Sequence, residues 1–363
     1  MRWPWLLAVL CLPPLPAEQI VWEVALPFRD AGRIRLADGL LLTGNITGRG
    51  GTTAFDAATG KLLWRVGGQQ RGGPIPGPKA VFTANHEIGA SALDPKTGKP
   101  IWRAPEMVLA SYIDMAYDGS NLYIAGFAGK LWALDAATGK LRWEHVHQPG
   151  DRAGACLSTP VIGEGILIYG GGAPDSITAL LWGLDPATGR EIWRTPAGCA
   201  KGLALSGGIV VMTSGGLMTG LDARTGKLLW RTPPVADNKW LSEPVIDGGR
   251  AYAIHENGLV GYNLTTGRQE FDFPGNFPHS DARRHLQIVS GKAYFVANFE
   301  QPRSEGNRSG FLYALDLASK QVLMRHRVNR DKRYAEKAST SHFRVDGEFI
   351  YYENESLLVK LRQ

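Results

Sequence analysis

One eleven-residue pattern recurs along the chain, in which Ala or Gly, Asp, Thr-Gly and a final Trp keep fixed positions. The complete copies span Ala54–Trp64, Ala92–Trp102, Ala133–Trp143, Gly183–Trp193 and Gly220–Trp230. Two divergent copies, Gly261–Phe271 and Ala314–Met324, end in a different large residue. A pattern that returns roughly every 40 residues predicts a repeat architecture rather than a set of unlike domains.

The segments between the copies have the residue pattern of short β-strands. Residues 245–249, 251–254 and 259–262 illustrate the plan: an apolar run that ends in a Gly-containing turn, a β-rich run and a further short strand. Alternating runs separated by Gly and Asp predict four antiparallel strands per unit. In the repeated turn the Asp side chain can accept backbone N–H bonds, and Gly allows a positive φ.

The two ends of the chain complete each other. Trp22, within residues 20–24, resembles the last strand of a unit without the turn before it. Residues 346–352 and 357–361 resemble earlier strands without a final strand after them. We therefore predict an all-β, eight-bladed β-propeller in which the N-terminal strand closes the last blade and leaves no open seam. Seven blades are the alternative if the end segments are not strands.

The repeated pattern is similar to the tryptophan-docking motif of the pyrroloquinoline-quinone (PQQ)-type β-propellers. That family includes quinoprotein alcohol dehydrogenases and an eight-bladed outer-membrane assembly lipoprotein. The resemblance covers nearly the whole chain and implies that the conserved positions of the motif brace neighbouring blades rather than bind a ligand. These positions are Asp56, Trp64, Asp94, Trp102, Asp135, Trp143, Asp185, Trp193, Asp222 and Trp230.

The first residues differ in kind from the repeats. Met1-Arg2 is basic, residues 3–12 are mostly apolar, and Ala17 offers a small residue at a cleavage point. We interpret residues 1–17 as a signal peptide and 18–363 as one propeller domain, which predicts a periplasmic or secreted protein. Leu10 before Cys11 is larger than a lipoprotein signal uses. The rest of the chain has no apolar run of about eighteen residues, so we expect no transmembrane helix.

Two cysteines remain after the leader. Cys156 and Cys199 occupy the same place in consecutive units, near the start of the innermost strand of each blade. Such places lie side by side around a propeller channel. In an oxidising compartment the two thiols could form a disulfide. The alternative is a pair of free, partly buried thiols.

The charge of the chain bears on its partners. The formal net charge is +6, but an exported protein without a nucleic-acid-binding module is a poor candidate for binding nucleic acid. We expect a monomer whose partner is another exported protein, a peptide or an anionic glycan.

Variable loops are the expected binding region. The repeated turns share one face of the ring, whereas the loops that lead into each blade vary and share the other face. These loops contain Arg33 and Asp114 together with a basic and aromatic group that we predict to bind a ligand: Lys239, Trp240, Arg283, Arg284, His285, Lys332 and Arg333. Guanidinium and ammonium groups suit carboxylate or phosphate ligands. The alternative is a set of solvated charges, with Trp240 packed against a neighbouring loop.

Catalytic signatures are weak. The chain has no haem-attachment, phosphate-loop or nucleophile-elbow motif. His145 and His147 alternate along a strand, but no third metal ligand accompanies them. The family resemblance leaves a PQQ-dependent alcohol or sugar dehydrogenase with Ca²⁺ as the alternative function, with Asp114, Glu243 and Asp281 as the nearest metal ligands. We favour a non-catalytic binding scaffold with no cofactor.

Overall fold

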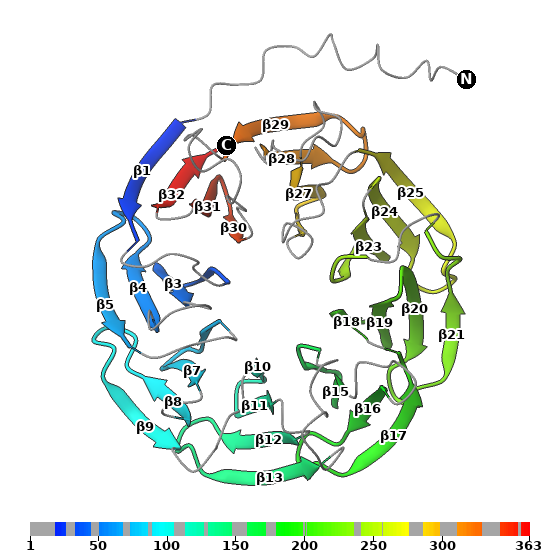
Figure 1. Cartoon of the computed structure of the whole chain (residues 1–363), viewed down its shortest axis with the longest axis horizontal. Helices are drawn as coiled ribbons and strands as arrows, with labels where there is room; N and C mark the ends of the chain where they lie inside the picture. The colour runs from blue at the N-terminus through cyan, green and yellow to red at the C-terminus, as the bar shows by residue number, and fades with distance from the viewer. Residues whose placement is uncertain are drawn as a thin grey trace.

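A computed structural model gives the fold of the protein. It describes residues 19–26, 33–44, 51–67, 73–85, 89–104, 113–126, 130–146, 158–171, 179–198, 200, 202–235, 241–255, 257–275, 286–297, 311–328, 342–354 and 357–363. These residues form eight four-stranded antiparallel sheets arranged in a ring (Figure 1). The eight-bladed β-propeller predicted from the repeat is confirmed. Among the described residues no helix could cross a membrane, and the predicted leader lies outside them.

The blades follow one another along the chain. Blade 1 contains β2 (Arg35–Ala37), β3 (Leu40–Gly44), β4 (Thr52–Asp56) and β5 (Leu62–Val66). Blade 2 contains β6 (Ile75–Pro76), β7 (Val81–Asn85), β8 (Gly89–Leu93) and β9 (Pro100–Ala104). Blade 3 contains β10 (Ile113–Tyr117), β11 (Asn121–Gly126), β12 (Lys130–Asp135) and β13 (Leu141–Val146). Blade 4 contains β14 (Val161–Gly163), β15 (Ile166–Gly171), β16 (Leu180–Leu184) and β17 (Glu191–Pro196).

The second half repeats this order. Blade 5 contains β18 (Gly202–Ser206), β19 (Ile209–Ser214), β20 (Leu217–Asp222) and β21 (Leu228–Arg231). Blade 6 contains β22 (Val245–Asp247), β23 (Arg250–His255), β24 (Gly258–Asn263) and β25 (Gln269–Pro274). Blade 7 contains β26 (Gln287–Val289), β27 (Lys292–Ala297), β28 (Phe311–Asp316) and β29 (Val322–Arg327). Blade 8 contains β30 (Phe343–Asp346), β31 (Phe349–Asn354), β32 (Leu357–Arg362) and β1 (Gln19–Ala25).

The N-terminal strand closes the ring, as predicted. β1 pairs antiparallel with β32, and Trp22 lies opposite Lys360. The carbonyl of Ala57 in blade 1 accepts hydrogen bonds from Trp22 Nε1 over 3.4 Å and from Lys360 Nζ over 3.1 Å. Lys360 is buried and its Nζ lies 4.0 Å from the centre of the Phe349 ring. The seam between the two ends of the chain is therefore held by polar and cation–π contacts as well as by strand pairing.

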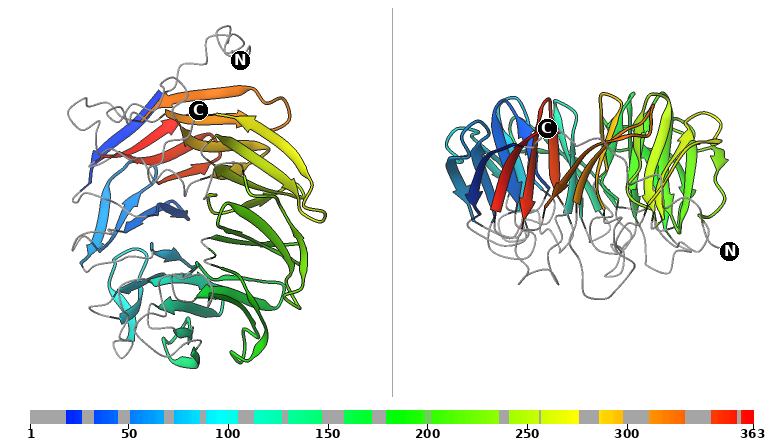
Figure 2. Two further views of the ribbon diagram at one scale, coloured as in Figure 1. Left: turned by 45° about the vertical axis from the view of Figure 1, so that its right-hand side comes forward. Right: turned by 90° about the horizontal axis from the view of Figure 1, so that it is seen from above.

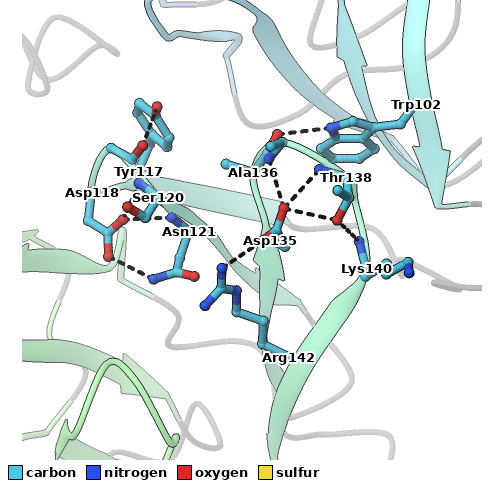
Figure 3. A network of polar contacts seen from close by, with 12 residues as sticks. Trp102, Tyr117, Asp118, Ser120, Asn121, Asp135, Ala136, Thr138, Lys140 and Arg142 are labelled. Atoms are coloured by element: carbon cyan, nitrogen blue, oxygen red, sulfur yellow. Dashed lines mark hydrogen bonds and ion pairs between the residues drawn. The ribbon is translucent and has the colours of Figure 1, made fainter.

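In every repeated turn the Asp or Asn side chain accepts a hydrogen bond from the backbone N–H three residues later, as Figure 3 shows for blade 3. Asp135 Oδ1 accepts bonds from the backbone N–H of Thr138 over 2.9 Å and from its hydroxyl over 2.9 Å. The hydrogen bonds from Arg142 and Thr138 lower the pKa of Asp135 to about 2. Gly139 adopts a φ of 72°, and a Cβ there would lie 2.5 Å from the Trp102 ring. The Asp, Thr and Gly of the pattern thus shape a turn that fits against an indole.

Indoles join most blades to the next. Trp102 Nε1 of blade 2 donates to the carbonyl of Ala136 in blade 3 over 2.9 Å (Figure 3). The same bond recurs from Trp64 to Pro95, Trp143 to Pro186, Trp193 to Ala223 and Trp230 to Leu264. Buried apolar clusters also span neighbouring blades, such as Phe82 and Ala92 with Leu122 and Ile124. The core is therefore a set of layers between blades.

Different contacts support the divergent copies. At Phe271, Lys320 of the next blade places its Nζ 5.1 Å from the ring centre and donates to the Asp272 carbonyl over 2.9 Å. Two residues beyond Met324, His326 Nε2 lies 2.7 Å from the Tyr352 hydroxyl of blade 8. These bonds join blades at which no indole stands at the end of the repeat.

Candidate functional site

The first strand of each blade lines the central channel, and strand pairing fixes which residues share a level around it. Arg35 pairs with Leu42, which pairs with Ala54 of the repeat. In blade 4 the equivalent residue is Val161, which pairs with Ile168, and Ile168 in turn pairs with Gly183 of the repeat. Two residues earlier, Arg33 therefore corresponds to Thr159. The same register gives one ring of described residues: Arg33, Gly73, Asp114, Thr159, Gly202, Glu243 and His342.

This ring lies at one mouth of the channel. Its residues lie just before or at the start of the first strands, whereas the hairpin and repeated turns lie at the other ends of the strands, on the upper side of the right-hand view in Figure 2. We call the side of the ring residues the loop face. The sequence prediction of two unlike faces, one formed by repeated turns and one by the starts of blades, thus corresponds to the two ends of the strands.

Arg33 crosses the channel at this level. Its Nη2 atom donates to Glu243 Oε1 of blade 6 over 3.0 Å and lies 3.3 Å from Thr159 Oγ1 of blade 4. Blades 1, 4 and 6 are not neighbours in the ring (Figure 1). A side chain at Gly73 would contact Arg33, and one at Gly202 would contact Glu243. The two glycines therefore leave the space in which the ion pair forms.

Local sequence explains why Thr159 and Glu243 face the channel. Each is the middle residue of a Ser-x-Pro segment. Ser158 Oγ accepts the N–H of Gly170 over 2.7 Å, and Ser242 Oγ accepts the N–H of Ile254 over 2.9 Å. These bonds turn both serines toward the second strand of their own blades. Because side chains alternate along an extended segment, the next residue points into the channel.

The carboxylates keep Arg33 charged. Burial opposes the positive charge, but Asp114 and Glu243 outweigh it and together raise the pKa of Arg33. Asp114 and Glu243, noted from the sequence as metal-ligand candidates, are thus close enough to act electrostatically on one arginine. No group of three His, Cys, Asp or Glu side chains with metal-binding geometry occurs within the described ranges.

A cavity of about 150 Å³ lies beside the ion pair. Blades 6, 7, 8 and 1 supply its walls, and its lining consists of Arg33, Ile34, Arg35, Glu243, Leu286, Gln287, His342, Phe343 and Arg344. The Gln287 side chain joins two blades, because its Nε2 donates to the Phe343 carbonyl over 2.5 Å and its Oε1 accepts the Val345 N–H over 3.1 Å. One wall of the cavity is therefore fixed by hydrogen bonds.

The charged form of Arg35 is destabilised in this cavity. Burial lowers the pKa of Arg35 to about 10, with further contributions from the neighbouring charges of Arg33 and Arg344. Asp114 and Glu243 act in the opposite direction but do not compensate. Counting the described residues, the cavity thus has an excess of positive charge near Arg35.

The structure describes some of the residues selected from the sequence and not others. Most lie outside the described residues: Lys239, Trp240, Arg283, Arg284, His285, Lys332, Arg333, Asp281, Cys156 and Cys199. The basic ligand site and the disulfide therefore stay predictions. His145, considered as a metal ligand, lies with its Nδ1 atom 2.7 Å from the Tyr169 hydroxyl of blade 4. Sequence reasoning missed Arg35, Gln287 and Arg344, although β alternation from Arg33 would have placed Arg35 in the channel.

Comparisons with known proteins agree with this architecture. A family model described as outer membrane protein assembly factor BamB matches residues 15–174 and 178–357. BamB of Nitrosomonas eutropha is 28% identical over 210 residues, or 53% of this chain and 48% of that protein. The dehydrogenase subunit of the quinone alcohol dehydrogenase of Gluconobacter oxydans is 30% identical over 155 residues, or 37% of this chain and 20% of that protein.

A solved structure extends the comparison to the whole ring. The crystal structure of BamB from Moraxella catarrhalis matches with a TM-score of 0.67 at 14% identity, covering 96% of this chain and 98% of that chain. This likeness concerns the fold, and the sequence matches to the two curated relatives span about half of one and a fifth of the other. Because the family model matches nearly all of the sequence, the chain belongs to the family of PQQ-repeat β-propellers described as outer membrane protein assembly factor BamB.

Proposed function

We propose that this protein is an exported, non-catalytic propeller that binds another exported protein or peptide through its loop face. Residues 1–17 would direct export, and the ring would act as a rigid scaffold for the loops between the blades. The family description, an assembly factor, supports a protein partner. The exposed positions on a rigid scaffold are also where binding residues are usually found.

The observation that carries the proposal is the Arg33–Glu243 ion pair. It places the protein's own side chains across the channel mouth between two blades that are not neighbours in the ring. The adjoining cavity measures about 150 Å³, whereas pockets for drug-sized ligands have volumes of about 300–1,000 Å³. The body of a protein or peptide partner is therefore expected to contact the loop face rather than enter the channel among these residues.

The PQQ-dependent dehydrogenase is the alternative, since a quinone alcohol dehydrogenase is among the relatives. Such an enzyme needs space for a three-ring cofactor and a set of oxygen ligands for Ca²⁺. The described channel residues suit this poorly, because Arg33 already binds the Glu243 carboxylate and the cavity beside it is small. We therefore derive no catalytic step from them.

Site-specific cross-linking tests the binding role. A photoreactive residue is introduced in place of Asn257, which is exposed between β23 and β24 on the loop face. The matched control replaces Lys96, which is exposed in a repeated turn on the opposite face. We expect an adduct with one defined envelope protein from position 257 and none from position 96. An adduct from position 96 alone, or from neither position, would contradict the proposal.

A further inference from the structure

Two arginines from neighbouring blades lie at the same level of the channel. Arg35 begins β2 in blade 1 and pairs with Leu42, and Arg344 in β30 of blade 8 pairs with Tyr351. Strand pairing assigns both to the level below Arg33, and both line the cavity of about 150 Å³. Ring closure makes blades 8 and 1 adjacent (Figure 1).

Among the described residues, the groups around these two arginines do not neutralise them, although Asp114 and Glu243 act in that direction on Arg35. The Glu243 carboxylate forms its ion pair with Arg33. Gln287 directs both ends of its amide to the backbone of blade 8. Within the described part of the chain, neither Arg35 nor Arg344 forms an ion pair or hydrogen bond with a side-chain carboxylate. The cavity lining thus contains three guanidinium groups and one carboxylate.

This arrangement favours an anion over an empty, water-filled space. Neighbouring like charges in a partly enclosed channel repel each other, and an anion between them replaces repulsion with attraction. The lowered pKa of Arg35 has this cause in part, since Arg33 and Arg344 both contribute to it. Guanidinium forks match the oxygen spacing of carboxylate and phosphate groups and can bind them through two parallel hydrogen bonds.

We propose that this cavity is a binding site for a small oxyanion, a phosphate or carboxylate group held between Arg35 and Arg344. The size of the cavity suits one such group rather than a ring system. The group is either a free ion or a carboxylate that a bound peptide inserts into the channel. In the second case the site would anchor the partner assigned to the loop face, and to that extent it rests on the proposed function.

Calorimetric titration of the intact protein with inorganic phosphate, at constant ionic strength in chloride buffer, tests the site. We compare the wild type with Arg35→Gln, Arg344→Gln and the double variant. The control is Arg231→Gln, which removes the same charge from the exposed outer strand β21. Loss of either channel arginine should weaken phosphate binding by about tenfold or more, because a charge-assisted fork is lost, whereas Arg231→Gln should leave it unchanged.

Two further arms distinguish the source of the anion. A short peptide with a free C-terminal carboxylate is titrated beside the same peptide with an amidated end. Displacement of phosphate by the free carboxylate alone identifies a peptide terminus as the ligand, and phosphate binding without peptide binding identifies a free ion. Thermal unfolding checks that each variant is folded, and Arg344→Gln, which changes an exposed side chain, remains informative if Arg35→Gln is not.

The proposal is overturned if neither anion binds saturably, or if the double variant binds phosphate as well as the wild type. It is also overturned if PQQ binds through these arginines and phosphate does not compete with it. Failure of anion binding would leave the cross-linking result at position 257 unaffected, so this proposal and the scaffold role can fail separately.

Discussion

Arg33 and Glu243, which are 210 positions apart in the sequence, form an ion pair of 3.0 Å across the channel. Their side chains are 23% and 32% exposed, which places the pair between a surface and a buried salt bridge. The bond joins blade 1 to blade 6, which are separate sheets and not neighbours in the ring. It therefore ties two non-neighbouring blades together and narrows the mouth through which a ligand would enter.

Breaking this pair should lower the free energy of unfolding. We expect Arg33→Ala to cost about 1–2 kcal/mol, between the values for exposed and buried pairs. Urea denaturation measures the change, and a double-mutant cycle with Glu243→Gln isolates the coupling between the two side chains. Arg231→Ala on the exposed outer strand is the control and should change stability by less than about 0.5 kcal/mol. A coupling energy near zero would show that the ion pair contributes nothing.

The indole of Trp102 should contribute through its hydrogen bond as well as its size. Trp102→Phe removes the bond from Nε1 to the Ala136 carbonyl and should cost about 1–2 kcal/mol. Its neighbour Ile101 is 52% exposed, so Ile101→Ala is the matched control and should be nearly neutral. Chemical denaturation of the two variants side by side gives the comparison. Equal losses would mean that the orientation of the indole toward the next blade has no energetic value.

Alanine substitutions at two glycines distinguish the effect of backbone strain from the effect of steric fit. Gly119 and Gly139 both have positive φ values, 100° and 72°. A Cβ at Gly119 meets nothing within 4 Å, whereas one at Gly139 would lie 2.5 Å from the Trp102 ring. Gly119→Ala should therefore cost about 1–2 kcal/mol of conformational strain. Gly139→Ala should lower the stability clearly more, because the new Cβ also displaces the Trp102 indole. Thermal unfolding of the two variants measures the difference. The reverse order would contradict the fit of turn and ring.

The stability of the protein should fall in mildly acidic solution because of His145. Burial lowers the pKa of His145 in the folded state, whereas a histidine in the unfolded chain has a pKa of about 6.5. As the pH decreases from about 7.5 to 5.5, the unfolded chain therefore binds a proton that the folded chain does not, and the free energy of unfolding decreases. The decrease ends once the pH lies below the folded-state pKa.

Denaturation curves across this pH range test the role of His145 by slope rather than by absolute stability. His145→Gln should show a shallower dependence on pH than the wild type. If both proteins lose stability with the same slope, then another group is responsible.

The repeat predicted the fold because its information is local. The Asp-x-x-Thr-Gly turn forms its bonds within a few residues, as Asp135 and Thr138 show. Even the ring closure could be inferred, since Trp22 resembles the ends of the other blades. The candidate site was harder to predict from the sequence. Arg33 and Glu243 were visible as charged residues, but their pairing depends on the distance across the channel, which no local pattern contains.

The arginine pair was missed for a related reason. Arg35 and Arg344 lie at opposite ends of the sequence, and only the closure of blade 8 by β1 brings their blades together. Each is one residue of an ordinary strand. Their common level in the channel follows from the register of two separate hairpins, β2 with β3 and β30 with β31.

Reconstitution with the quinone decides whether this protein is a scaffold without PQQ. The purified protein is titrated with PQQ and Ca²⁺ while absorbance and dye-linked oxidation of alcohols and sugars are followed, beside a quinoprotein alcohol dehydrogenase treated in the same way. We expect neither saturable PQQ binding nor dye reduction for this protein. Stoichiometric PQQ binding accompanied by turnover of an alcohol or sugar would contradict it.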